Sequence, residues 1–417
     1  MTSPPVTARP SSLIPSASDR PGDDPIFALN AEATARAQAG EDVLNATLGA
    51  LIEADGSLAT MPAVEEAFRR IPLARASVYA PISGTPKFLS AVIEDVYGGS
   101  CMVERSLAVA TPGGTGALHH AIVDFLEPGQ KLLTSSYRWG PYDIIAEHAG
   151  RGVDTFDMYT ADGRFHLDAF EAALTAQLRS QGRSLVVFNT PCHNPTGYSL
   201  DDAEWERSVE IVARASELGP VTFLLDFAYA KFAPPGAADW RQWLERMNEH
   251  STVLVAWSAS KAFAQYGSRV GALIASHPAE DERSRIKNAL GYSCRATWSN
   301  CNHLGMLAIS ELLCDEELKA KADEDRARLV ELLAKRVRVF NEHAREANLS
   351  YPRYEGGFFV SVFTSDALRT AESMRKRGVF VVPLNGAVRL ALCSTPATEV
   401  QRLVEALVEG LHAVEAH

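Results

Sequence analysis

Short apolar runs alternate with amphipathic segments along most of the chain. Between most of the runs, apolar residues recur at helical spacing, as in residues 168–178 and 201–217. Strands that alternate with helices are typical of βα units, in which the strands lie mainly parallel. The pattern therefore predicts an α/β fold with a mainly parallel sheet. Runs rich in β-branched residues predict its strands at residues 107–111, 131–135, 153–159, 184–189, 221–226, 252–258 and 269–275.

The pattern changes in the last quarter of the chain. Residues 315–348 carry apolar side chains near helical spacing among many charges, which predicts one long amphipathic helix that leaves the sheet. Three further strands, at 358–363, 379–384 and 388–393, precede a terminal helix. These elements are enough for a smaller α+β domain.

The first 25 residues are rich in Pro and Ser and lack the apolar centre of a secretory signal, so we expect a disordered tail. We expect the remainder to form two domains, because 417 residues exceed what one small core needs. The expected divisions are the tail (1–25), an N-terminal segment of the small domain (26–60), a large domain (61–320) and the rest of the small domain (321–417).

Composition narrows the classes of protein. The chain has 46% apolar and 22% charged residues, as ordinary globular proteins do, and no apolar run approaches the length of a membrane span. The net charge of −12 is spread along the sequence, which disfavours nucleic acid as a partner. The six cysteines form no CxxC pairs and have no histidines at metal-ligand spacing. We therefore expect reduced thiols, no metal and a cytoplasmic protein.

The strongest candidate for a reactive residue is Lys261. It follows the apolar run 252–258 in the stretch WSASKAFAQYGSRVG. A lysine held at a strand end, partly desolvated and close to cations, has a lowered pKa and can act as a nucleophile or Schiff-base amine. Ser258, Ser260 and Arg269 supply hydroxyls and a guanidinium for a phosphate group. An ordinary surface lysine is the alternative, which this spacing of five fixed residues disfavours.

Three further segments end predicted strands. Asp226 and Tyr229 lie in DFAYAKF, and Asn194 lies in the turn NPTG. An N-cap aspartate and a structural turn are the alternatives for these two segments. The third, TPGGTGALHH, runs through glycines into a helix and predicts an anion site or else a plain tight turn. Its candidate phosphate-binding residues are Gly113, Gly114 and Thr115.

A phosphate cradle, an aspartate, a phenol, an amide and a lysine at the strand ends of one sheet suit pyridoxal 5'-phosphate. In this interpretation Lys261 forms the Schiff base, and Asp226 faces the pyridinium nitrogen. Tyr229 and Asn194 face the ring oxygen.

Many segments resemble those of fold-type I pyridoxal-phosphate aminotransferases, and within that group the aspartate and aromatic amino-acid aminotransferases. The likeness covers nearly everything after the tail. It is carried by DPIFALN, LNATLGALIEADGSLATMPAV, YAPISGTPKF, TPGGTGAL, CHNPTG, DFAYAKF, SASKAFAQYGSRVG, RATWSN and VRLALC. The resemblance implies a large domain with a mainly parallel seven-stranded sheet flanked by helices, a smaller α+β domain and a homodimer.

The resemblance also implies roles for further residues. Tyr79 would reach the phosphate from the neighbouring subunit, and Trp139 would stack on the cofactor ring. Arg389 would bind the α-carboxylate of the substrate, and Arg295 would meet a distal carboxylate across the dimer interface. Gly49 would lie in the loop that closes over substrate.

Several positions depart from the family pattern. Tyr137 stands where relatives usually carry Pro, and Tyr142 replaces the usual histidine that backs the cofactor aspartate. Asp226 must therefore find another partner. Val78 replaces a common Asn, and Cys301 and Asn302 stand where relatives tend to have two prolines. All these changes lie around the expected cofactor and substrate, so the substrate could be unusual.

The function expected from these residues is transfer of an amino group between an L-amino acid, acidic or aromatic, and a 2-oxo acid, through aldimine, quinonoid and ketimine intermediates on Lys261 and its cofactor. The alternative keeps the cofactor but ends in γ-elimination, γ-replacement or C–C bond formation on an S-adenosylmethionine-like amino acid. A non-catalytic ligand-binding protein on the same fold is a third hypothesis.

Overall fold

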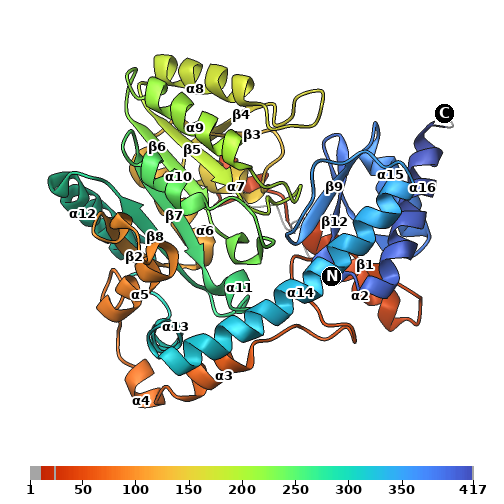
Figure 1. Ribbon diagram of the computed structural model, residues 1–417, viewed down its shortest axis with the longest axis horizontal. Coiled ribbons are helices and arrows are strands. Elements are labelled where there is room, and N and C mark those ends of the chain that lie inside the picture. Colours follow the sequence, from red (N-terminus) through yellow and green to blue (C-terminus); the bar gives the residue numbers. More distant parts are fainter. Residues whose placement is uncertain (1–10, 23–24, 416–417) are drawn as a thin grey trace, which may run out of the picture.

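The structure is a computed structural model that describes residues 11–22 and 25–415 (Figure 1). The predicted tail lies partly outside the described residues, at 1–10 and 23–24, and its disorder stays a prediction. Within it, Pro15–Ser18 forms a short exposed helix, α1. The next helix is α2 (Pro25–Gln38).

A seven-stranded sheet forms the larger lobe, in the order β2-β8-β7-β6-β5-β3-β4. All neighbours are parallel except that β8 runs antiparallel to both β2 and β7. The predicted α/β class with a mainly parallel sheet of seven strands is confirmed. The strands are β2 (Ser106–Pro112), β3 (Lys131–Ser135), β4 (Gly152–Phe156), β5 (Ser184–Asn189), β6 (Val221–Asp226), β7 (Thr252–Ser258) and β8 (Val270–Ser276).

Helices cover both faces of this sheet, because successive strand residues are apolar on both sides. Leu224 packs in one core cluster and its neighbour Phe223 in the other. The first cluster draws on α6 (Gly113–Phe125), α7 (Pro141–His148) and α12 (Glu280–Thr297). The second draws on α5 (Pro86–Tyr97), α8 (Leu167–Gln181), α9 (Asp202–Ala215) and α10 (Trp240–Met247). Burial on both faces is what a parallel sheet requires.

The predicted long helix is α14 (Glu316–Glu346), and it begins one residue later than expected. Figure 1 shows it running from α13 (His303–Cys314) and α3 (Pro62–Arg69) to a smaller lobe. That lobe holds an antiparallel sheet in the order β11-β12-β9. α15 packs against this sheet, and α16 packs against both α15 and α14. Its elements are β9 (Phe359–Phe363), α15 (Ala367–Lys376), β11 (Val382–Leu384), β12 (Ala387–Ala391) and α16 (Val400–Glu415).

The N-terminal part of the chain joins the smaller lobe. β1 (Leu44–Asn45) pairs parallel with β10 (Val379–Phe380). One strand was expected over 379–384, and that prediction was wrong. The run splits because β10 pairs with β1, whereas β11 pairs with β12. The expected strand 388–393 ends early as well, at Ala391, and continues as a 3-10 turn over Leu392–Ser394 (η3).

The expected domain boundaries at residues 60 and 320 stay predictions. Within 11–22 and 25–415, no helix is both long and apolar enough to cross a membrane. The other short elements are α4 (Leu73–Ala76), η1 (Cys101–Val103), η2 (Ala230–Phe232), α11 (Ala259–Ala262) and η4 (Ala397–Glu399).

Candidate active site

The predicted site residues gather where strands of the large sheet end. β2 and β7 point the same way because each is antiparallel to β8. The carboxyl ends of β2, β5, β6 and β7 therefore lie at one edge of the sheet. This edge is where α/β proteins of this kind bind their ligands.

Lys261 lies in α11, immediately after β7, and its amine is buried beneath the smaller lobe. Its Nζ donates to the Gly49 carbonyl at 2.8 Å and lies 4.5 Å from the centre of the Tyr266 ring. Burial lowers the pKa of Lys261 to about 8, and the positive charges of Arg269 and Arg389 act in the same direction. About one tenth of this amine is therefore neutral at pH 7, far more than of an ordinary lysine.

The residues expected to form an anion cradle lie near this amine. Ser258 caps α11 by accepting a hydrogen bond from the Ser260 amide, and Arg269 Nη1 donates to Ser260 Oγ at 3.3 Å. Gly113 opens α6 with a φ of 71°, and a Cβ added there would lie 2.6 Å from Arg269 Nη2. A Cβ at Gly271 would lie 2.4 Å from the Gly113 carbonyl carbon. Gly113 thus lets the guanidinium approach the start of the helix, and Gly271 lets β8 pack against the same point.

Two other predicted phosphate ligands border the same space. Gly114 is half-buried, and a Cβ there would lie 3.5 Å from the Ser258 Cβ. Thr115 is exposed in the first turn of α6. The free amide groups at the start of this 13-residue helix favour an anion.

Asp226 is buried at the end of β6, and its carboxylate has a hydrogen-bond donor. The Tyr142 hydroxyl, on α7, donates to Asp226 Oδ2 at 2.6 Å. The partner is therefore the residue that replaces the family's histidine. Burial raises the pKa of Asp226, and the hydrogen bond from Tyr142 opposes that shift.

An amide network orients the remaining residues. Asn189, the last residue of β5, accepts from the Asn194 backbone amide at 2.6 Å and donates to the Asp226 carbonyl at 3.0 Å. Asn194 Nδ2 in turn contacts the Tyr229 hydroxyl at 3.3 Å. Asn194, Tyr229 and Asp226 are thus brought together as predicted.

Arg389 extends from the smaller lobe into the same site. It lies in β12, is only 5% exposed and donates to the Thr47 carbonyl at 2.6 Å. Its Nη1 contacts Asn194 Oδ1 at 3.5 Å, and its guanidinium stacks 4.3 Å from the centre of the Phe359 ring. A guanidinium held this way can present N–H groups to a carboxylate.

Three predicted residues lie further out. Trp139 is half-buried and packs edge-on against Tyr142, with ring centres 5.6 Å apart. Tyr79 is 89% exposed, and Arg295 is exposed and donates to Ser299 Oγ at 2.6 Å. The roles of Tyr79 and Arg295 across a subunit interface stay predictions.

The sequence analysis missed three residues that this geometry brings in: Tyr142 as the partner of Asp226, Asn189 and Tyr266. Asn189 carried a usable signal, because a polar residue that ends a buried strand must be hydrogen-bonded. Tyr142 contacts Asp226 from 84 positions away, which local patterns do not reveal. Tyr266 lies near Lys261 in the sequence, but its bond with the Leu51 amide is long-range.

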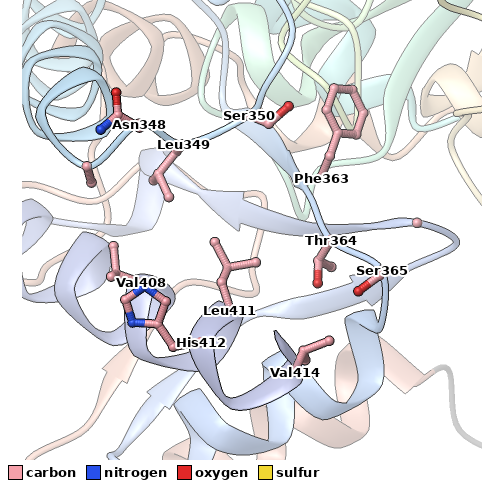
Figure 2. A pocket seen from close by; sticks show the side chains of 12 residues that line it. Asn348, Leu349, Ser350, Phe363, Thr364, Ser365, Val408, Leu411, His412 and Val414 are labelled. Carbon is pink, nitrogen blue, oxygen red and sulfur yellow. The ribbon is translucent and has the colours of Figure 1, made fainter. Parts of the chain in front are cut away.

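A separate pocket of about 440 Å³ lies on the smaller lobe, between the end of α14 and α16 (Figure 2). Phe363, Leu411 and His412 are among the residues that line it. None of the predicted site residues belongs to its described lining, so this pocket is not the candidate active site.

Comparison with known proteins identifies the family. Residues 42–407 match the family described as aminotransferase class I and II. The aromatic-amino-acid aminotransferase of Escherichia coli K12 is 29% identical over 377 residues, which cover 88% of this chain and 92% of that protein. That of Pseudomonas aeruginosa is 30% identical over 315 residues, which cover 73% and 75%. A solved aminotransferase from Anaerococcus prevotii superposes with a TM-score of 0.89 at 30% identity, covering 96% of this chain and 99% of that one. The chain therefore belongs to the class I and II aminotransferases.

Proposed function

We propose that this protein is a pyridoxal-phosphate-dependent aminotransferase that moves an amino group between an acidic or aromatic L-amino acid and a 2-oxo acid. One observation carries the proposal. The buried amine of Lys261, with its lowered pKa, lies at one edge of the sheet with an anion cradle and the carboxylate of Asp226. The names of the relatives support amino-group transfer.

The side chains suit the cofactor in charge and hydrogen bonding. Gly113 lets the Arg269 guanidinium lie against the start of α6, and together they would hold the phosphate. Gly114, Thr115, Ser258 and Ser260 would complete that cradle. When bound, pyridoxal phosphate supplies an aldehyde that condenses with amines and a ring that withdraws electrons.

Each remaining residue has a proposed task. Asp226 would keep a proton on the ring nitrogen, because a buried carboxylate that accepts from Tyr142 needs a positive partner. Asn194 and Tyr229 would donate to the ring oxygen, and Trp139 would cover one face of the ring. Lys261 Nζ, when neutral, accepts the proton from the α-carbon of the amino acid and can return it as an acid.

Substrate recognition is assigned to two arginines. Arg389 would exchange the Thr47 carbonyl for the α-carboxylate of the substrate, and a carboxylate is the better acceptor. Arg295 and Tyr79 would act in the site of a second subunit, which makes a homodimer part of the proposal. Gly49 would lie in the segment that covers the substrate. A cytoplasmic location is also proposed, because all six cysteines are free.

The relatives do not favour the alternative outcome. Relatives of this chain are named as aromatic-amino-acid, tyrosine and aspartate aminotransferases, and these names describe amino-group transfer. The geometry of Lys261, Asp226 and Arg389 also disfavours a non-catalytic binding protein, which would not need a buried amine of lowered pKa.

A substrate screen tests the proposal. Purified protein supplied with pyridoxal phosphate should be yellow and convert aspartate or an aromatic amino acid to its keto acid, with equal formation of an amino acid from the 2-oxo acid. Lys261→Ala should lose both the colour and the transfer. Colourless protein that takes up no cofactor, or release of a thioether without amino transfer, would contradict it.

A further inference from the structure

The segment after β1 offers three successive carbonyl oxygens to side chains of the site. The Thr47 carbonyl accepts from Arg389 at 2.6 Å, the Leu48 carbonyl from Cys393 Sγ at 3.3 Å, and the Gly49 carbonyl from Lys261 Nζ at 2.8 Å. Arg389 and Lys261 have assigned partners in the proposed reaction. Cys393 has none, and neither the sequence analysis nor the proposed function uses it.

Cys393 is well placed to anchor this segment. It lies in η3, directly after β12, and is 0% exposed. Its amide donates to the Phe358 carbonyl at 3.2 Å, and its carbonyl accepts from the Ile52 amide at 3.0 Å. Arg336, from α14, donates to the carbonyls of both Cys393 and Ile52. These hydrogen bonds hold the backbone of Cys393 in place, and they therefore also fix the position from which its thiol reaches Leu48.

The thiol stays a hydrogen-bond donor at working pH. Burial raises the pKa of Cys393 to about 12, although the charges of Lys261 and Arg389 act in the opposite direction. A neutral S–H is a weak donor, so its hydrogen bond to the Leu48 carbonyl is weak. Because the thiol is uncharged, charged ligands do not compete strongly for it. Unlike an ammonium or a guanidinium, it would not be drawn away by a carboxylate or a phosphate.

We propose that Cys393 is a positioning residue, whose thiol holds the Leu48 carbonyl and keeps residues 47–51 over the site while Lys261 and Arg389 turn to the cofactor and the substrate. This inference rests on the proposed function. An amine bonded to the cofactor no longer has the same N–H groups for Gly49, and a guanidinium that clamps a carboxylate uses the N–H groups that Thr47 now receives. The thiol contact with Leu48 is the one of the three that neither event removes.

Hydrogen exchange followed by mass spectrometry tests this position directly. The amides of Leu51, which donates to Tyr266, and Ile52, which donates to Cys393, report on the segment. In Cys393→Ala, with pyridoxal phosphate bound, we expect these amides to exchange about five-fold faster than in the parent protein. Cys393→Ser should restore slow exchange, because a hydroxyl also donates. Cys294→Ala, which removes a buried thiol from α12, is the control and should leave this segment unchanged.

The kinetic readout separates positioning from general damage. KM for both substrates should rise several-fold in Cys393→Ala while kcat changes less, and Cys393→Ser should recover the KM. Parent-like exchange and KM in Cys393→Ala would overturn the proposal, as would a Cys393→Ser variant no better than the alanine. If Cys393→Ala fails to fold, Cys393→Ser is tested alone. Faster exchange of the Leu51 and Ile52 amides in this variant than in the parent protein would reject the positioning role of Cys393. Parent protein that exchanges slowly but transfers no amino group would refute the function instead.

Discussion

The partner of Asp226 is a phenol, and this choice affects the charge of the site. An imidazole in the same position would titrate near neutral pH, whereas the pKa of Tyr142 is raised well above its ordinary value by burial and by Asp226. The hydroxyl therefore donates at every working pH. Asp226 thus gains a constant hydrogen bond without a second titrating group beside it.

Tyr142→Phe should weaken cofactor binding and lower kcat. The substitution leaves the buried Asp226 carboxylate without its 2.6 Å donor, and a hydrogen bond to a charged group contributes enough for a loss of about 10-fold or more. Spectroscopic titration of the cofactor-free variant measures the affinity. Tyr351→Phe, which removes a phenol that bonds to Asn341 in the smaller lobe, is the control. Unchanged affinity in Tyr142→Phe would show that Asp226 does not depend on this donor.

Cofactor uptake should become faster as pH rises through about 8. Only the neutral form of Lys261 attacks an aldehyde, and burial lowers its pKa from 10.5 to about 8. The free energy of unfolding should also rise as pH increases from about 8 to 10.5, because in that range the unfolded chain binds a proton that the folded protein has lost. Rates of uptake by cofactor-free protein at a series of pH values measure the midpoint. A midpoint near 10.5 would mean that the amine is solvated.

Residues in compact motifs could be predicted, and those joined by long-range contacts could not. Lys261, Ser258 and Ser260 stand close together in the sequence, so their spacing was informative. Tyr142 and Asp226 are 84 positions apart, and the sequence analysis noted Tyr142 only as a departure. The contact between Tyr142 and Asp226 depends on how α7 packs on the sheet. The spacing of apolar residues in the sequence does not predict that packing.

At the scale of elements, strand positions were more predictable than strand directions. All seven strands of the large sheet were found from their apolar runs, but nothing in those runs indicated that β8 is antiparallel and lies between β2 and β7. The same limit explains the wrong prediction over 379–384. An apolar run reveals burial but not a change of pairing partner, such as the one between β10 and β11.

Gly271→Ala should disturb the junction of β8 with the start of α6. The new Cβ would lie 2.4 to 2.6 Å from backbone atoms of Gly113, so the strand and the helix must separate. We expect a stability loss of about 1–3 kcal/mol in denaturant unfolding. Binding of pyridoxal phosphate should weaken as well, because Arg269 and the first turn of α6 move apart. Gly267→Ala, whose Cβ would meet nothing within 4 Å, is the matched control and should behave like the parent. Equal stability of the two variants would contradict the argument.

At the scale of the whole molecule, the surface suggests how copies associate. Large apolar side chains are normally covered, yet Leu73, Val78, Tyr79 and Ile82 are all exposed within one short stretch. Tyr292, which precedes Arg295 on α12, is exposed too. These residues support the proposal that a second copy covers this surface and that sites are shared between subunits.

Mixing two damaged chains should restore activity. In a heterodimer of Lys261→Ala with Tyr79→Phe, one site combines an intact Lys261 with an intact Tyr79 from the other chain. Random pairing makes half of the dimers mixed, so activity should reach about one quarter of the parent value above the residual activity of the separate variants. Co-expressed chains with two different affinity tags allow the mixed dimer to be purified and assayed. If the mixed dimer is no more active than the two separate variants, Tyr79 does not act in the site of the neighbouring subunit.

The pairing of β1 with β10 also sets an order of assembly during protein synthesis. Leu44 leaves the ribosome early, but its partner Val379 follows only when most of the chain has been made. The large sheet, complete at Ser276, can form while translation continues, because domains tend to fold as they emerge. Arg389 and Cys393 emerge later still, after β10. The cradle around Lys261 can therefore form in a nascent chain well before the smaller lobe covers that cradle. The cofactor can enter during that interval.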